Sequence, residues 1–156
     1  MKSMQQWLAD YGESHRNPKN KLIHWICVPL ILFSVLGLLW LVPVPAAVAQ
    51  YGAWVNWASL LMALTVIYYV LLSPSIAIGM AMVALVMFTV ISRLQEAAPA
   101  PLWMIFTGIF VAAWIGQFIG HEIEGKRPSF FKDLQFLLIG PAWLMADVYR
   151  KSGIKV

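Results

Sequence analysis

The stretch LIHWICVPLILFSVLGLLWLVPV, residues 22–44, opens an uncharged sequence that decides the fold class. From Leu22 to Ser92 the chain contains no Asp, Glu, Lys or Arg, and a second uncharged run extends from Ala97 to Gly120. Apolar runs of this length are typical of membrane spans, which need about 20 consecutive apolar residues. The 156 residues are 61% hydrophobic, with a mean hydropathy of +0.74. We therefore predict an all-α membrane protein in which residues 1–156 form a single polytopic domain.

Proline, glycine and charged residues divide the apolar sequence into four segments, which we predict to be transmembrane helices. The segments cover approximately residues 25–42, 54–72, 76–94 and 102–119. Each is near the lower end of the about 17–25 residues that a span requires. Before them, from about Ser3, we expect an interfacial helix with Trp7, Leu8 and Tyr11 on one side.

The C-terminal part of the chain contains a fifth apolar stretch, from Leu134 to Ala146. It is too short to span a membrane if it is straight, and Gly140-Pro141 interrupts it. We therefore predict a re-entrant or interfacial helix pair after the fourth span.

The positions of lysine and arginine predict the orientation of the chain in the membrane. The loop between the first and second segments has no charge, and the loop between the third and fourth has only Arg93 as a basic residue. All other basic residues precede the first segment or follow the fourth: Lys2, Arg16, Lys19, Lys21, Lys126, Arg127, Lys132, Arg150, Lys151 and Lys155. The positive-inside rule then places both termini in the cytoplasm, and an even number of spans agrees with this. We expect a bacterial inner-membrane protein, or one of the endoplasmic reticulum in a eukaryote. Basic residues that flank spans also argue against a nucleic-acid partner, despite a net charge of +4.

This orientation brings the chain's three histidines to one face of the membrane. His15 and His24 precede the first segment and His121 follows the fourth, so all three are predicted at the cytoplasmic face. Asn17-Pro18 prevents a straight helix through the first two, and we expect the turn from Asn17 to Asn20 to fold His15 back toward His24. Two or three neutral imidazoles can hold Fe(II) or Zn(II) and leave coordination positions open.

A single histidine at a membrane interface is more often a solvated or capping side chain than a ligand. Only the coincidence of three at one face favours a metal site. Glu124 lies three residues after His121 and shares its helical face if the fourth helix extends that far. The sequence HEIE at residues 121–124 lacks the second histidine of the HExxH zinc motif, and we give that partial match no weight.

Two blocks of sequence carry a resemblance to a known family. YGESHRNPKNKLIHWICVP, residues 11–29, resembles the signature Y-x-x-x-H-x-N-P-x-N-x-x-x-H of the 2-hydroxy fatty acid dioxygenases of fatty acid α-oxidation, which include a fungal enzyme of the phytosphingosine pathway and bacterial relatives. QFIGHEIEGKRPSFFKDL, residues 117–134, is similar to the second signature, Q-F-x-G-H followed by an acidic-basic turn and a proline. The stretch between His121 and Pro128 is one residue shorter than in the fungal protein, which also has a histidine where this chain reads SRLQEAAP.

The resemblance implies a non-haem Fe(II) dioxygenase that uses O2 to shorten a 2-hydroxy fatty acid by one carbon. Carried onto this chain, the catalytic metal ligands would be His15, His24 and His121, with Glu124 as a fourth ligand or an orienting carboxylate. Arg127 or Lys126 would pair with the substrate carboxylate. The groups that would surround the metal or substrate are Tyr11, Asn17, Asn20, Gln117 and Arg127.

Other functions remain open from the sequence alone. A non-enzymatic membrane scaffold would use the histidines only as caps, and a zinc-dependent lipid hydrolase would use the same three ligands. A transporter is disfavoured because no ionisable group lies within the predicted spans. Substrate chain length, the choice of iron or zinc, the role of Glu122, the source organism and the oligomeric state are all left open. We identify no strong small-xxx-small dimer motif in the spans.

Overall fold

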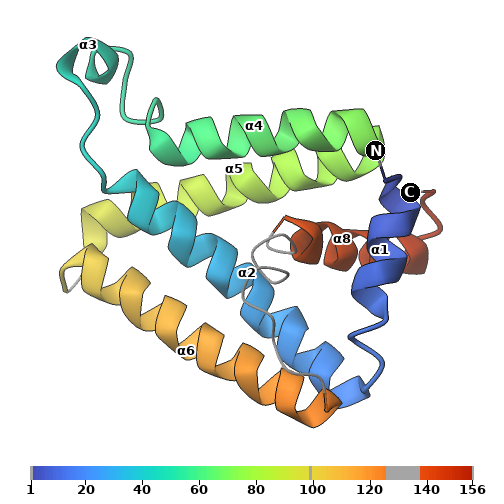
Figure 1. Cartoon of the computed structure of the whole chain (residues 1–156). Helices are drawn as coiled ribbons and strands as arrows, with labels where there is room; N and C mark the ends of the chain where they lie inside the picture. The colour runs from blue at the N-terminus through green and yellow to red at the C-terminus, as the bar shows by residue number, and fades with distance from the viewer. Residues whose placement is uncertain (1, 99, 126–137, 156) are drawn as a thin grey trace.

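In the computed structural model, residues 2–98, 100–125 and 138–155 are described, and all regular structure among them is helical. The all-α class predicted from the sequence is confirmed for these residues. In chain order the helices are α1 (Met4–Gly12), α2 (Pro18–Trp40), α3 (Ala46–Ala49), α4 (Trp57–Leu72), α5 (Pro74–Ala97), α6 (Leu102–Glu124) and α8 (Ile139–Lys151) (Figure 1).

Three of these helices, α2, α5 and α6, are long and apolar enough to cross a membrane. Many of their large apolar side chains are exposed on the outside of the bundle, Leu22, Ile26 and Leu85 among them. The helices therefore indicate a membrane protein. Helix α4 is also apolar but has only 16 residues, so the described helices include three of sufficient length rather than the four predicted.

Helix α2 begins at Pro18, earlier than the predicted span. The Asn17 side chain caps the helix by accepting a hydrogen bond of 2.9 Å from the backbone N–H of Lys19. Proline at the first helical position has a backbone already suited to the helix and lacks an N–H that would need a partner. The expected turn from Asn17 to Asn20 is therefore wrong: the chain turns before Asn17, and Asn20 and His24 both lie within α2.

The long helices alternate in direction along the bundle (Figure 1). Helix α2 makes its most extensive contact with the antiparallel α6, and α4 packs along α5. Glycine makes the first of these contacts close. A Cβ atom at Gly37 would lie 2.5 Å from the ring of Phe106, and one at Gly116 would lie 2.5 Å from the sulfur of Cys27. Such distances require that the position have no side chain.

Helices α1 and α8 pack on each other beside the start of α2 (Figure 1). A capping box formed by Ser3 and Gln6 starts α1, so the predicted N-terminal helix is confirmed. Its side chains Trp7, Leu8 and Tyr11 pack around a small core that contains Ile139, Trp143 and Leu144 of α8. The side of α1 predicted to be apolar is therefore covered by protein.

Gly140-Pro141, where the sequence predicts an interruption, lies at the start of a helix. Both residues lie in the first turn of α8, where a proline is tolerated because its N–H would have no helical partner. The structure describes one helix within residues 138–155, and residues 134–137, where the first helix of the predicted pair would lie, are outside the described residues. The Tyr149 hydroxyl donates to the Ser75 carbonyl at 2.9 Å, and the Tyr69 hydroxyl donates to the Leu138 carbonyl.

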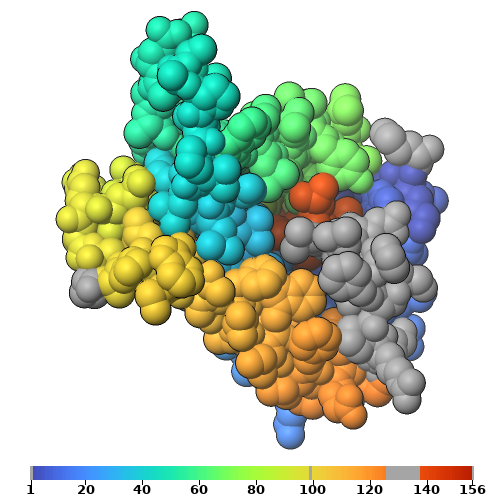
Figure 2. All heavy atoms as spheres, turned by 60° about the vertical axis from the view of Figure 1, so that its left-hand side comes forward, coloured from blue at the N-terminus to red at the C-terminus, as the bar shows by residue number. Residues whose placement is uncertain are grey.

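The opposite end of the bundle contains the short helix α3 in the connection from α2 to α4. This connection projects from the rest of the molecule (Figure 2), and no residue of α3 is buried. Nearby, the Trp40 indole N–H donates to Gln95 Oε1 at 2.8 Å and joins the end of α2 to the end of α5.

Candidate metal centre

The structure brings the three histidines together, although they come from distant parts of the chain. The ring centroids are 4.1 Å apart for His15 and His24, 5.2 Å for His24 and His121, and 5.9 Å for His15 and His121. One nitrogen of each ring lies within 4.8 Å of one nitrogen of each of the others. Two nitrogens bound to one ion at about 2.0–2.1 Å are at most about 4.2 Å apart. The three nitrogens therefore lie close to the spacing that one shared ion requires.

Backbone carbonyls fix the tautomers of two of these rings. His15 Nδ1 lies 2.6 Å from the carbonyl oxygen of Tyr11, and His24 Nδ1 lies 2.9 Å from the carbonyl oxygen of Asn20. A carbonyl can only accept, so each Nδ1 carries the proton. Nε2 is then the nitrogen whose lone pair can bind a metal. A donated Nδ1–H is the usual partner arrangement of metal-binding histidines.

Packing around His15 holds its ring in place. The Tyr11 ring stacks on it at a centroid distance of 4.1 Å with an interplanar angle of 11°, and Trp143 of α8 lies 5.7 Å away. His15 and His24 are 3% and 1% exposed, whereas His121 is half-buried. His121 is therefore the most exposed of the three histidines.

The approach of α6 to α2 places His121 beside His24. Gly120 faces Asn20 at such short range that a Cβ atom there would lie 2.4 Å from Asn20 Oδ1 and 3.4 Å from His24 Cε1. Gln117, one turn earlier on α6, is also buried. A side chain at position 120 would thus separate two of the three imidazoles.

The Glu124 carboxylate accepts hydrogen bonds from residues at the start of α2 and just before it. Its oxygens accept hydrogen bonds from the backbone N–H groups of Arg16 at 2.9 Å and Asn17 at 3.0 Å. The Asn20 side-chain amide donates a third at 3.0 Å. Among the described residues, the group able to hold a metal contains the three histidines and leaves Glu124 out.

The predicted site residues divide clearly by their positions. His15, His24 and His121 form the cluster, with Tyr11, Asn20 and Glu124 in contact with its members or their backbone. Asn17 serves as the cap of α2 and donates its N–H to Glu124. Lys126 and Arg127, predicted to pair with a substrate carboxylate, lie outside the described residues.

Sequence reasoning missed two features of the site. Gly116 and Gly120 form a G-x-x-x-G spacing, the close-approach motif of membrane helices, and here it joins α6 to α2 of the same chain. This close contact lies within one chain, so the prediction that the spans carry no strong dimer motif stays untested. The second feature, Trp143, carries no signal in the sequence beyond being an apolar residue in α8.

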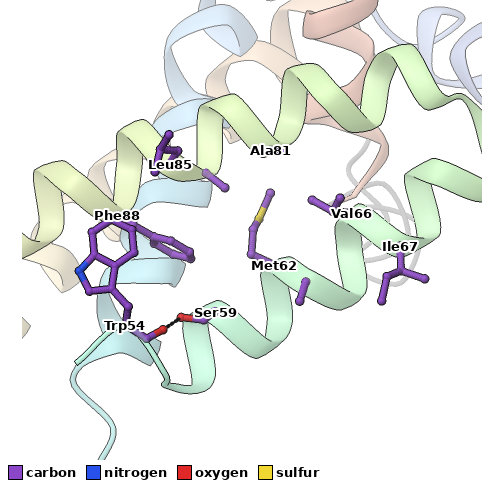
Figure 3. Close-up of a pocket in the computed structure, with 10 residues that line it drawn as sticks. Trp54, Ser59, Met62, Val66, Ile67, Ala81, Leu85 and Phe88 are labelled. Atoms are coloured by element: carbon purple, nitrogen blue, oxygen red, sulfur yellow. Dashed lines mark hydrogen bonds between the residues drawn. The ribbon is translucent and has the colours of Figure 1, made fainter. Parts of the chain in front are cut away.

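A separate groove of about 470 Å³ lies between α4 and α5. It is lined by apolar side chains such as Trp54, Met62 and Phe88, and no histidine borders it (Figure 3). The histidine cluster, rather than this groove, is therefore the candidate functional site. Its three imidazoles, two of which have their tautomers set by backbone carbonyls, are ligands that suit a divalent transition-metal ion.

Comparisons with known proteins agree with the resemblance seen in the two sequence blocks. A family model described as "2-hydroxy-palmitic acid dioxygenase Mpo1-like" matches residues 1–152. The chain is 31% identical over 150 residues to the 2-hydroxy-palmitic acid dioxygenase MPO1 of Saccharomyces cerevisiae, an alignment that covers 94% of this chain and 79% of that protein. No solved structure matches the chain significantly.

Proposed function

This chain belongs to the Mpo1-like family, and on that premise we propose that it is a membrane dioxygenase that shortens 2-hydroxy fatty acids by one carbon with Fe(II) held by His15, His24 and His121. The observation that carries the proposal is the meeting of the three imidazoles within 4.8 Å in a chain similar to a 2-hydroxy-palmitic acid dioxygenase. A scaffold whose histidines only cap helices gives no reason for them to converge.

Each group around the cluster has a defined task in this proposal. His15 and His24 hold their protons on Nδ1 against backbone carbonyls, so that Nε2 faces the ion as a neutral donor. When bound, Fe(II) supplies the one-electron chemistry that lets O2 react with an organic substrate. Tyr11 and Trp143 exclude water from the His15 side, and in this proposal the substrate approaches on the side of His121, the most exposed of the three histidines.

The proposed substrate suits a site at the end of membrane helices. A 2-hydroxy carboxylate is a polar, bidentate head on an apolar chain, so the head can reach the cluster while the chain stays beside the exposed apolar faces of α2 and α6. The reaction balances as RCH(OH)COOH and O2 giving RCOOH, CO2 and water.

We also propose that α4 completes a four-span topology. The alternating directions of α2, α4, α5 and α6 support it, since they return the end of α6 to the side on which α2 begins (Figure 1). Both termini and the histidine cluster would then face the cytoplasm, as the basic residues predict.

The test is to purify the protein anaerobically in detergent and measure bound metal and O2 consumption. We expect near-stoichiometric iron, and O2 uptake with 2-hydroxypalmitic acid but not with palmitic acid. His15→Ala, His24→Ala and His121→Ala should each lose the iron and the uptake. Glu122→Gln is the matched control, because Glu122 is an exposed carboxylate next to His121.

The alternatives give different results in the same experiment. Stoichiometric zinc without O2 uptake would replace the proposal by a zinc-dependent lipid hydrolase. If wild-type protein holds no metal after loading with either ion, the result would favour a non-enzymatic membrane scaffold.

A further inference from the structure

One carboxylate connects the three segments that carry the histidines. Glu124 accepts the N–H of Arg16, the neighbour of His15, and the side-chain amide of Asn20, whose own carbonyl accepts Nδ1–H of His24. Glu124 itself lies three residues after His121 on α6. Each hydrogen bond that Glu124 accepts from the described residues joins positions at least 104 apart in the sequence.

The position of Glu124 is unfavourable within its own helix. It is the last residue of α6, where the partial negative charge of a helix C-terminus repels a carboxylate. The same carboxylate lies at the N-terminus of α2. The N–H groups there have no acceptor within their own helix, and they carry a positive partial charge that attracts an anion. The neighbouring helix, rather than α6, therefore accounts for an acidic residue at this position.

From this geometry we propose that Glu124 is a positioning residue. It ties the start of α2 and the preceding turn to the end of α6 and thereby sets the spacing of the three imidazoles. The inference deepens the proposed function and rests on it for the identity of the ion. Asn20 is the second part of the same link, since its amide also donates to the Ser14 carbonyl at 3.2 Å, just before His15.

The test compares Glu124→Gln with Glu122→Gln in full-length protein in detergent micelles. Glutamine has nearly the shape of glutamate but has no charge, and the NH2 group that replaces one of the two carboxylate oxygens cannot accept a hydrogen bond. We use Co(II) as a redox-stable probe and measure its affinity and its visible absorption spectrum. Loss of a group that orients metal ligands commonly weakens metal binding about 10- to 100-fold. We expect this loss and an altered Co(II) spectrum for Glu124→Gln, and wild-type behaviour for Glu122→Gln.

A second measurement does not depend on metal. Amide hydrogen exchange of the peptide that covers residues 13–20 should be faster in Glu124→Gln than in wild type, because the uncharged side chain keeps only one of the two oxygens that accept the Arg16 and Asn17 N–H groups. If wild-type protein binds no Co(II), the metal function fails while this exchange still decides the positioning role. Wild-type affinity, spectrum and exchange in Glu124→Gln would overturn the inference.

Two further variants separate positioning from general stability. Gly37→Ala disturbs the α2–α6 contact far from the histidines and should leave the Co(II) spectrum unchanged. If Glu124→Gln does not fold, Asn20→Ala removes the amide from the other side of the link, and we expect several-fold weaker Co(II) binding. Unchanged binding and exchange in Asn20→Ala would then overturn the inference.

Discussion

The two ends of the helical bundle differ in construction, although the same helices α2 and α6 reach both. At one end, Asn20, His24 and His15 are almost fully buried and are joined to α6 by hydrogen bonds and ring contacts. At the other end, α3 has no buried residue. Burying polar groups in an apolar protein is costly unless they are paired, and in membrane proteins such groups usually have a function. The contrast therefore points to the histidine end as the part of the molecule that does chemistry.

The largest effect should come from two equivalent substitutions at opposite ends of the α2–α6 contact. Gly120→Ala places a Cβ atom 2.4 Å from Asn20 Oδ1, and Gly37→Ala places one 2.5 Å from Phe106. Overpacking should lower the free energy of unfolding by about 1–3 kcal/mol in both variants. Only Gly120→Ala should also lose metal binding, by tenfold or more. Unfolding in SDS-containing mixed micelles, followed by circular dichroism, and metal titration measure the two quantities. Equal loss of metal in both variants would erase the distinction between the ends.

The next effect should come from the cap of α2. Asn17→Ala removes the side-chain oxygen that accepts the Lys19 N–H, which should cost about 0.5–2 kcal/mol of stability. Asn17→Ser retains a capping oxygen and serves as the control. Because the start of α2 also carries the contacts to Glu124, Asn17→Ala should weaken metal binding. A loss of stability with unchanged metal affinity would show that the cap and the histidine cluster are independent.

A polar contact at the other end should affect stability alone. Gln95→Leu removes the acceptor of the partly buried Trp40 indole N–H and should cost about 1 kcal/mol or somewhat more, because the donor is left without a partner. Metal affinity and O2 uptake should equal those of wild type. Weaker metal binding in this variant would mean that the two ends are coupled through α2.

The smallest effect is expected in the projecting connection. Tyr51 is 73% exposed, and Tyr51→Ser should change stability by no more than about 0.5 kcal/mol. Thermal melting in detergent and O2 uptake should match wild type. A clear loss of activity with normal folding would instead indicate that this connection has a role in the reaction.

The part of the fold that depends on apolar runs could be predicted from the sequence. Helices at positions close to 54–72, 76–94 and 102–119 follow from hydropathy and from proline and glycine punctuation. The start of α2 was missed because a cap at Asn17 and a proline at Pro18 extend a helix into polar sequence, which hydropathy does not register. The placement of the three histidines at one face could be predicted from topology. An even number of spans brings the end of the last helix back to the side on which the first begins.

The contacts that hold the site together could not be predicted. Nothing local indicates that Glu124 accepts hydrogen bonds from residues more than 100 positions away, because the pairing depends on how closely α6 approaches α2. Gly116 and Gly120 contain that information, but a G-x-x-x-G spacing does not say which helix it will meet. The position of the Trp143 ring near His15 depends on the docking of α8, which has no sequence signature.

The separation of the histidines along the chain has a consequence for biosynthesis. Residues 15 and 24 leave the ribosome early, whereas residue 121 and the carboxylate at 124 follow only when the last long helix is made. A nascent chain that stops before α6 therefore has two imidazoles and no third. The proposed three-histidine site can therefore be completed only after α6 has been made.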